Sequence, residues 1–98
     1  MEMYLIYDRK AQNVQSFFTA DNHVSAIRAV INAGKQAGST LADYPQDFEL
    51  RHVGTLDRFS CAIMLNEVPE ILGSVDNLLA ASAPKPVTPD QVRVVKKD

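Results

Sequence analysis

Positively charged and aromatic side chains are the residues of this sequence whose types support a recognisable chemistry. The cations that suit a phosphate-binding surface are Arg9, Lys10, Arg28, Arg51, Arg58, Lys96 and Lys97. The aromatic residues that can stack on bases are Tyr4, Tyr7, Phe17 and Phe18. Proteins that bind nucleic-acid single strands combine a positive groove with aromatic platforms, because every base has a π-face. The combination favours binding, although scattered cations are ordinary at this chain length and the two phenylalanines also suit a core.

The overall charge opposes a strongly basic nucleic-acid clamp. The chain has 98 residues, with 10 Lys and Arg against 12 Asp and Glu, and a net charge of −2. A local basic patch is compatible with such a balance. Binding to another protein through an uncovered apolar surface is the competing interpretation, and the net charge favours it.

Catalytic and metal-binding motifs are missing from the sequence. His23 and His52 are far apart along the chain, and no nucleophile motif accompanies them, although His52 can neighbour a carboxylate across strands. The aspartates lack the spacing of a calcium-binding loop. Gly34 and Gly38 lie at the C-terminal end of the predicted helix, which is the wrong end for phosphate capture. We therefore expect no enzymatic activity, no metal site and no cofactor.

The single cysteine and the hydropathy pattern indicate a cytoplasmic protein. Cys61 lies in an alternating apolar run, which predicts a buried, reduced thiol. No apolar run approaches the ~20 residues that a membrane span requires, so we expect no membrane association.

A helix from Asp21 to Gly38 is the element around which the others are arranged. Asp21 is placed to cap its first turn. Its apolar positions recur at three- and four-residue steps, which predicts that they share one buried face. They are Val24, Ile27, Val30, Ile31 and Gly34.

Four strands are predicted to form the sheet against which this helix packs. Met1–Tyr7 is apolar on both sides, as a central strand is, and Val14–Thr19 can return from a polar turn as the second strand of a hairpin. Alternation of side chains places the other two strands at Phe48–Thr55 and Arg58–Leu65, joined by a turn at Gly54–Asp57. The order predicts an α+β fold, a β-β-α-β-β core with an antiparallel sheet on one main helix.

The C-terminal part of the chain is predicted to be a short second helix and a tail. Helical spacing of apolar residues over Asn66–Ala80, with Pro69 in a first-turn position, indicates the helix. Residues 1–80 are then one domain, and residues 81–98 form a Pro-rich, mobile tail in which Gln91–Val95 can pair as an edge strand.

Homo-oligomerisation follows from the small number of helices. One main helix covers one face of a sheet, so the other face needs a partner, and we expect a homodimer. Tyr4 and Ile6 are the residues expected to be exposed without that partner.

Several local sequences, in their order and spacing, resemble a known family. Tyr44-Pro45-Gln46-Asp47-Phe48-Glu49-Leu50 is similar to the pattern H-P-x-D-[FY]-x-L, and Val53-Gly54-Thr55-Leu56-Asp57 to I-G-x-F-D. The opening strand with Tyr7-Asp8-Arg9-Lys10-Ala11, then Phe17-Phe18 and Ala26-Ile27-Arg28-Ala29, also matches. The chain thus resembles the small nonstructural protein of gokushovirus-type microviruses, the phage ORF5 family.

The resemblance implies a nonenzymatic viral accessory protein of the host cytoplasm that binds single-stranded DNA during genome replication or packaging. Arg51 and Arg58 flank the predicted Gly54 turn and are expected to lie near one another. The residues expected to contact DNA are Tyr7, Arg9, Lys10, Arg51, Arg58, Lys96 and Lys97. The alternative is an adaptor that recruits viral replication, host replication or capsid proteins without touching DNA.

Overall fold

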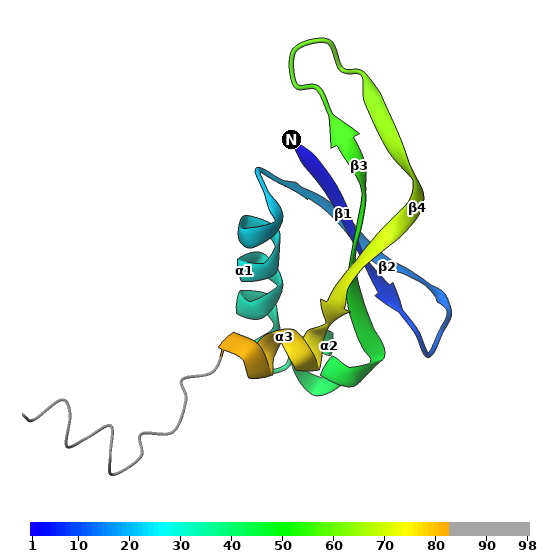
Figure 1. Cartoon of the computed structure of the whole chain (residues 1–98). Coiled ribbons are helices and arrows are strands. Elements are labelled where there is room, and N and C mark those ends of the chain that lie inside the picture. Colours follow the sequence, from blue (N-terminus) through cyan, green and yellow to red (C-terminus); the bar gives the residue numbers. More distant parts are fainter. Residues whose placement is uncertain (83–98) are drawn as a thin grey trace, which may run out of the picture.

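The computed structural model describes residues 1–82, which form four strands and a few helices (Figure 1). The strands are β1 (Glu2–Asp8), β2 (Asn13–Ala20), β3 (Phe48–Leu56) and β4 (Ile63–Ser74). The helical elements are α1 (His23–Gly34), α2 (Thr40–Asp43), the 3-10 turn η1 (Pro45–Asp47) and α3 (Val75–Ser82). Most of the predicted tail, including Gln91–Val95, Lys96 and Lys97, lies outside the described residues. Within residues 1–82, every helix is too short or too polar to span a bilayer.

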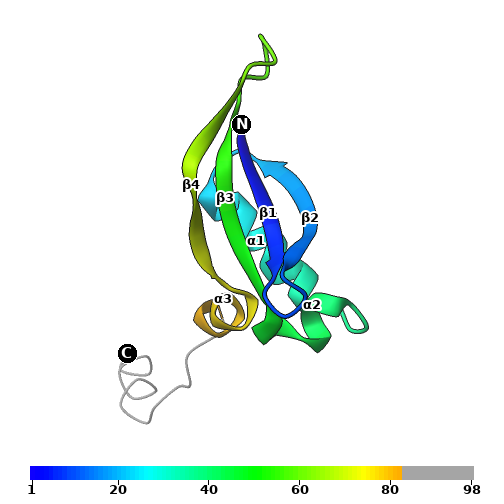
Figure 2. The ribbon, with the colours of Figure 1, turned by 90° about the vertical axis from the view of Figure 1, so that its right-hand side faces the viewer.

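The four strands form one antiparallel sheet in the order β2-β1-β3-β4. Helix α1 lies against one face, and α2 and α3 gather at one end of the sheet (Figures 1 and 2). The view in Figure 2 is onto the opposite face, with α1 behind the strands. The predicted α+β class with an antiparallel sheet is confirmed.

The buried face of α1 differs from the predicted stripe. Ala26, Val30 and Gly34 are buried, whereas Val24, predicted to pack on the sheet, has 57% of its surface exposed. The helix begins one residue later than predicted, because Asn22 rather than Asp21 is the cap: its Oδ1 accepts the N–H of Ser25 at 2.8 Å. Small residues on the buried face allow close packing. A Cβ added to Gly34 would lie 3.2 Å from a methyl carbon of Leu79 in α3.

The main core lies between α1 and the sheet, and it includes Tyr4 and Ile6. These two residues are 0% and 3% exposed, so the expectation that they need a partner subunit is wrong. Both faces of β1 are apolar, and α1 covers the face that was expected to stay open. The other buried members of this core are Ala26, Val30, Phe48, Leu50 and Val75.

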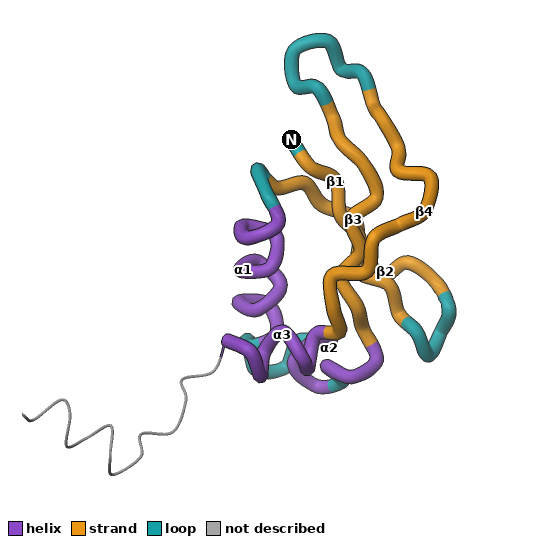
Figure 3. Tube along the Cα trace, in the orientation of Figure 1, coloured by secondary structure: helices purple, strands orange, loops and turns teal. Residues whose placement is uncertain are grey.

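The predicted strand Arg58–Leu65 is wrong, because a turn occupies its first half (Figure 3). Asp57 Oδ1 accepts the N–H groups of Phe59 and Ser60 at 2.9 and 3.0 Å, and the bonds from Ser60 and Phe59 hold the pKa of the Asp57 carboxyl below its ordinary value. Cys61 takes a left-handed conformation with φ of 66°. This turn chemistry outweighs the alternating pattern. Cys61 is consequently exposed, contrary to the predicted buried thiol.

The predicted helix Asn66–Ala80 is wrong over its first part, since β4 continues to Ser74 and only α3 is helical. Leu65 of β4 pairs with Gly54 of β3, and Glu70 of β4 pairs with His52 of β3. Between these two pairs, four residues of β4 lie opposite a single residue of β3, which makes a β-bulge. Pro69 lies in this bulge, on the outermost strand of the sheet. Proline has no backbone N–H, but at this position none is needed for a hydrogen bond to β3.

Candidate nucleic-acid interface

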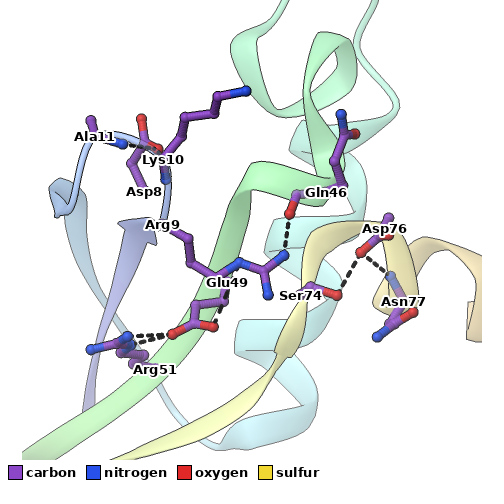
Figure 4. Close-up of polar contacts among 10 residues, drawn as sticks. All are labelled: Asp8, Arg9, Lys10, Ala11, Gln46, Glu49, Arg51, Ser74, Asp76 and Asn77. Carbon is purple, nitrogen blue, oxygen red and sulfur yellow. Dashed lines mark hydrogen bonds and ion pairs between the residues drawn. The ribbon is translucent and has the colours of Figure 1, made fainter.

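The β1–β2 hairpin loop positions Arg9 and Lys10. Asp8 Oδ1 accepts the backbone N–H groups of Lys10 and Ala11 at 2.9 and 3.0 Å, which fixes the loop. The N–H of Arg9 donates to the carbonyl oxygen of Asp47 at 2.8 Å, so the loop is joined to the segment that precedes β3. The Lys10 side chain extends away from the neighbouring ion pairs (Figure 4), which leaves its ammonium group available to an anion.

Glu49 holds two arginines of the predicted site. Its side chain is only 7% exposed, and its Oε2 accepts from Nε of Arg51 at 2.6 Å. Nε of Arg9 lies 3.9 Å from Oε1, and the Arg9 guanidinium also donates to the Gln46 carbonyl oxygen (Figure 4). A buried carboxylate requires such partners to offset its lost hydration. We call Arg9, Glu49 and Arg51 the Glu49 cluster; its two cations and one anion leave a net charge of +1.

A row of paired residues crosses all four strands on the face opposite α1. Leu5 pairs with Phe17 of β2 and with Arg51 of β3, and Arg51 pairs with Ile71 of β4. Directly paired residues point to the same face. This face is opposite α1 because the alternate residues of β1 and β3 are in the core. Phe17 and Ile71 are 58% and 59% exposed. We call these four residues the open row.

Tyr7 lies beside this row, and Arg51 packs over it. The guanidinium carbon of Arg51 is 3.9 Å from the centre of the Tyr7 ring. The ring attracts a cation at this distance, which helps to hold the guanidinium in place on the sheet face. Arg51 therefore joins the Glu49 cluster to the open row.

The remaining predicted site residues do not lie at this surface. Arg58 is in the β3–β4 turn, at the other end of the molecule from Arg9 and Lys10, and its NH2 group lies 3.1 Å from Asp21 Oδ1. The expectation that Arg51 and Arg58 are near one another is wrong, because Gly54 lies within β3 rather than in a turn. Arg28 is exposed on α1, on the other side of the sheet. Lys96 and Lys97 are outside the described residues.

A second polar cluster was not foreseen from the sequence. The rings of His23 and His52, 29 positions apart, have centres 4.8 Å apart, and the Glu70 carboxylate approaches both. The only sequence signal was that a strand residue such as His52 can neighbour a carboxylate. Helix α1 brings His23 to this place, and nothing in the spacing of the three residues indicates it.

One carboxylate near the Glu49 cluster has an altered acidity. The Ser74 hydroxyl donates to Asp76 Oδ1, and this bond, together with the N–H of Asn77, lowers the pKa of Asp76 (Figure 4). Asp76 therefore stays ionised at neutral pH, at the start of α3, where a negative charge is favourable.

The comparisons with known proteins give one family. Residues 1–78 match the family described as phage ORF5 protein, which includes β1 to β4 and the first half of α3. No curated protein and no solved structure matches the chain. The match spans most of the chain, and the chain therefore belongs to the phage ORF5 protein family.

Proposed function

We propose that this phage protein is a nonenzymatic accessory protein that binds single-stranded DNA along its open row. The observation that carries the proposal is that an exposed aromatic ring, Phe17, and a guanidinium, Arg51, lie on either side of Leu5 on one sheet face. The basic hairpin loop adjoins the same strands. The role that fits is in replication or packaging of a single-stranded phage genome in the host cytoplasm.

Each part of this surface supplies one component of single-strand recognition. Phe17 offers an exposed π-face, and stacking of a base on an aromatic side chain contributes about 1–3 kcal/mol. Arg9, Lys10 and Arg51 offer contacts to phosphate oxygens, which carry no sequence information. We therefore propose binding without strong sequence preference.

Glu49 limits the affinity. It subtracts one charge from the three cations Arg9, Lys10 and Arg51, so these four side chains carry a net charge of +2 against a whole-chain charge of −2. Each net positive charge contributes about 0.7 to the dependence of log K on log salt for a single strand. We expect a slope of about −1.4 and readily reversible binding.

Replacing Lys10 and Arg51 together by glutamine tests this surface. The substitution removes both net charges, so the slope of log K against log salt should flatten by about 1.4. Fluorescence anisotropy with a labelled oligothymidine across a salt series measures it. The matched control is the double variant Arg28→Gln and Arg58→Gln, which changes the net charge equally but lies away from the open row.

Equal losses in the two double variants would contradict the assignment of the site. Such a result would show that the response follows overall charge alone. A folded Lys10→Gln, Arg51→Gln variant with wild-type affinity and slope would exclude the surface altogether.

A second candidate function, binding to proteins, is favoured by the apolar outer strand. Five large apolar residues of β4 are between 59% and 74% exposed: Ile63, Met64, Leu65, Val68 and Ile71. An outermost strand also carries unpaired backbone groups that can extend a sheet into another chain. A second copy is the partner we propose, giving a homodimer; viral replication or capsid proteins are the partners in the adaptor alternative.

Val68→Glu is expected to weaken self-association. The side chain is 74% exposed, so a carboxylate there leaves the fold intact and opposes an apolar interface. Light scattering over a concentration series measures the mass. Val14→Glu, on the outermost strand at the other edge, is the control and should behave as wild type. A monomer mass for the wild type at every concentration would contradict the homodimer.

A further inference from the structure

Three potential metal ligands from three different elements converge beside the core. They are His23 in the first turn of α1, His52 in β3 and Glu70 in β4, and one ligand atom of each lies within 4.8 Å of the other two. Glu70 Oε1 is 3.5 Å from His23 Nε2 and 3.6 Å from His52 Nδ1.

The fold brings these residues together for identifiable reasons. The Asn22 cap starts α1 at His23, directly after β2. His52 pairs with Glu70 in the sheet, immediately beyond the β4 bulge, so the two side chains share a face. That face is the one α1 covers, since Tyr4 pairs with His52 and is buried in the core.

Two of the three ligand separations are close to those around a tetrahedral ion, and the third, between the two histidine nitrogens, lies within 4.8 Å. Zinc binds imidazole nitrogen at about 2.0–2.1 Å and carboxylate oxygen at about 2.0–2.2 Å. Two ligands of a tetrahedral ion at such distances are about 3.3–3.5 Å apart. The two distances from Glu70 Oε1, 3.5 and 3.6 Å, need only a small adjustment to reach these values.

The outer nitrogens of both histidines already have the partners that a metal-binding imidazole uses. His52 Nε2 is 2.7 Å from Glu2 Oε1, and His23 Nδ1 is 2.7 Å from the Tyr4 hydroxyl. Metal-ligating histidines direct the second ring N–H to a carboxylate or another oxygen, which fixes the ring and raises its basicity.

Asn66 occupies the side of His52 that a metal would approach. Its Nδ2 lies 3.1 Å from His52 Nδ1 and donates to the His52 carbonyl oxygen at 3.1 Å. A metal ion bound to His52 Nδ1 would replace its contact with the Asn66 amide. The hydrogen bond from Asn66 to the His52 carbonyl oxygen would still hold that amide in place. The ring nitrogen therefore loses no partner when metal binds.

We propose that His23 Nε2, His52 Nδ1 and the Glu70 carboxylate form a binding site for a divalent transition-metal ion of the zinc type. Two imidazoles and one carboxylate suit zinc and disfavour magnesium and calcium, which take oxygen ligands. The Glu70 side chain is 55% exposed, so water has access to the fourth position. The ion would join the start of α1 to β3 and β4, and this proposal is independent of DNA binding.

Zinc titration of the untagged full-length protein tests the site. Calorimetry should give one ion per chain, and the ring-proton NMR signals of both histidines should shift together. His23→Gln and Glu70→Gln should each lower the affinity at least about tenfold. Glu2→Ala, which removes the oxygen partner of His52 Nε2, should lower the zinc affinity about ten- to a hundredfold.

The controls separate this site from other zinc ligands. Cys61→Ser and Glu67→Gln remove an exposed thiol and an exposed carboxylate outside the cluster, and both should bind zinc as the wild type does. Magnesium in place of zinc should leave the histidine signals unchanged. The proposal is overturned if zinc shifts neither ring, or if binding survives in both His23→Gln and Glu70→Gln, or if Cys61→Ser abolishes it.

Discussion

Alanine at Gly54 is expected to destabilise the protein by about 3 kcal/mol or more, which is a large part of the roughly 5–15 kcal/mol by which a domain is stable. A Cβ at this position would lie 2.3 Å from the carbonyl oxygen of Met64 and 3.1 Å from the Cα of Leu65. Both are backbone atoms of the neighbouring strand, so no side-chain rotation relieves the overlap. The third neighbour, Met3 Cε at 2.9 Å, belongs to a flexible side chain and can move. The two strands must separate to admit the methyl group.

Urea unfolding followed by circular dichroism measures this loss. Thr55→Ala, at the next position of β3, is the matched control and should cost about 1 kcal/mol or less. Equal stability of Gly54→Ala and the wild type would show that the close pairing of β3 with β4 at Gly54 is incorrect.

Glutamine at Glu49 is expected to lower stability and raise affinity for DNA. The carboxylate is nearly fully buried between Arg9 and Arg51, so its neutralisation should cost about 1–3 kcal/mol, the lower values applying if the arginines turn towards water. The surface then carries three net charges rather than two. Affinity for a single strand should rise about fivefold at 0.1 M salt, and the slope should steepen by about 0.7.

Glu67→Gln is the matched control for Glu49→Gln. It makes the same change of net charge on β4, and within residues 1–82 Glu67 forms no ion pair. Its affinity and stability should stay near those of the wild type. If Glu49→Gln and Glu67→Gln raise affinity equally, Glu49 does not restrain the arginines in the manner described.

The elements with strong local signals could be predicted from the sequence. The apolar run of β1, the alternation in β3 and the helical spacing of α1 identified these elements, with ends within a few residues of those found. Which face of β1 is buried could not be predicted, because Tyr4 and Ile6 on one side and Leu5 and Tyr7 on the other are similarly apolar. Only the position of α1 decides between them.

The segment from Asp57 to Ser74 could not be predicted because two patterns compete there. Apolar residues at alternate positions continue through Phe59 and Cys61, yet the Asp57 side chain closes a turn around them. Beyond Asn66 the apolar spacing fits a helix as well as a strand, and Pro69 suits a first turn. Pairing with β3, a contact distant in sequence, selects the strand.

The candidate site was predicted as separate cations, and the structure shows how they are combined. Tyr7, Arg9, Lys10 and Arg51 gather near one another, whereas Arg58 does not. Glu49 lies two residues before Arg51 on β3, a spacing that puts both side chains on the same face of a strand. That spacing was the signal in the sequence for the ion pair between Glu49 and Arg51. The approach of Arg9 to Glu49 depends on the pairing of β1 with β3, which the local sequence does not indicate.

The central claim is single-strand binding by the open row and the adjoining hairpin loop. Its most direct test is the affinity of the wild-type protein for a labelled oligothymidine, measured by anisotropy from low to high salt. We predict a linear fall of log K with log salt and a slope of about −1.4. Absence of salt-dependent binding to any single strand would contradict the claim and favour the adaptor function.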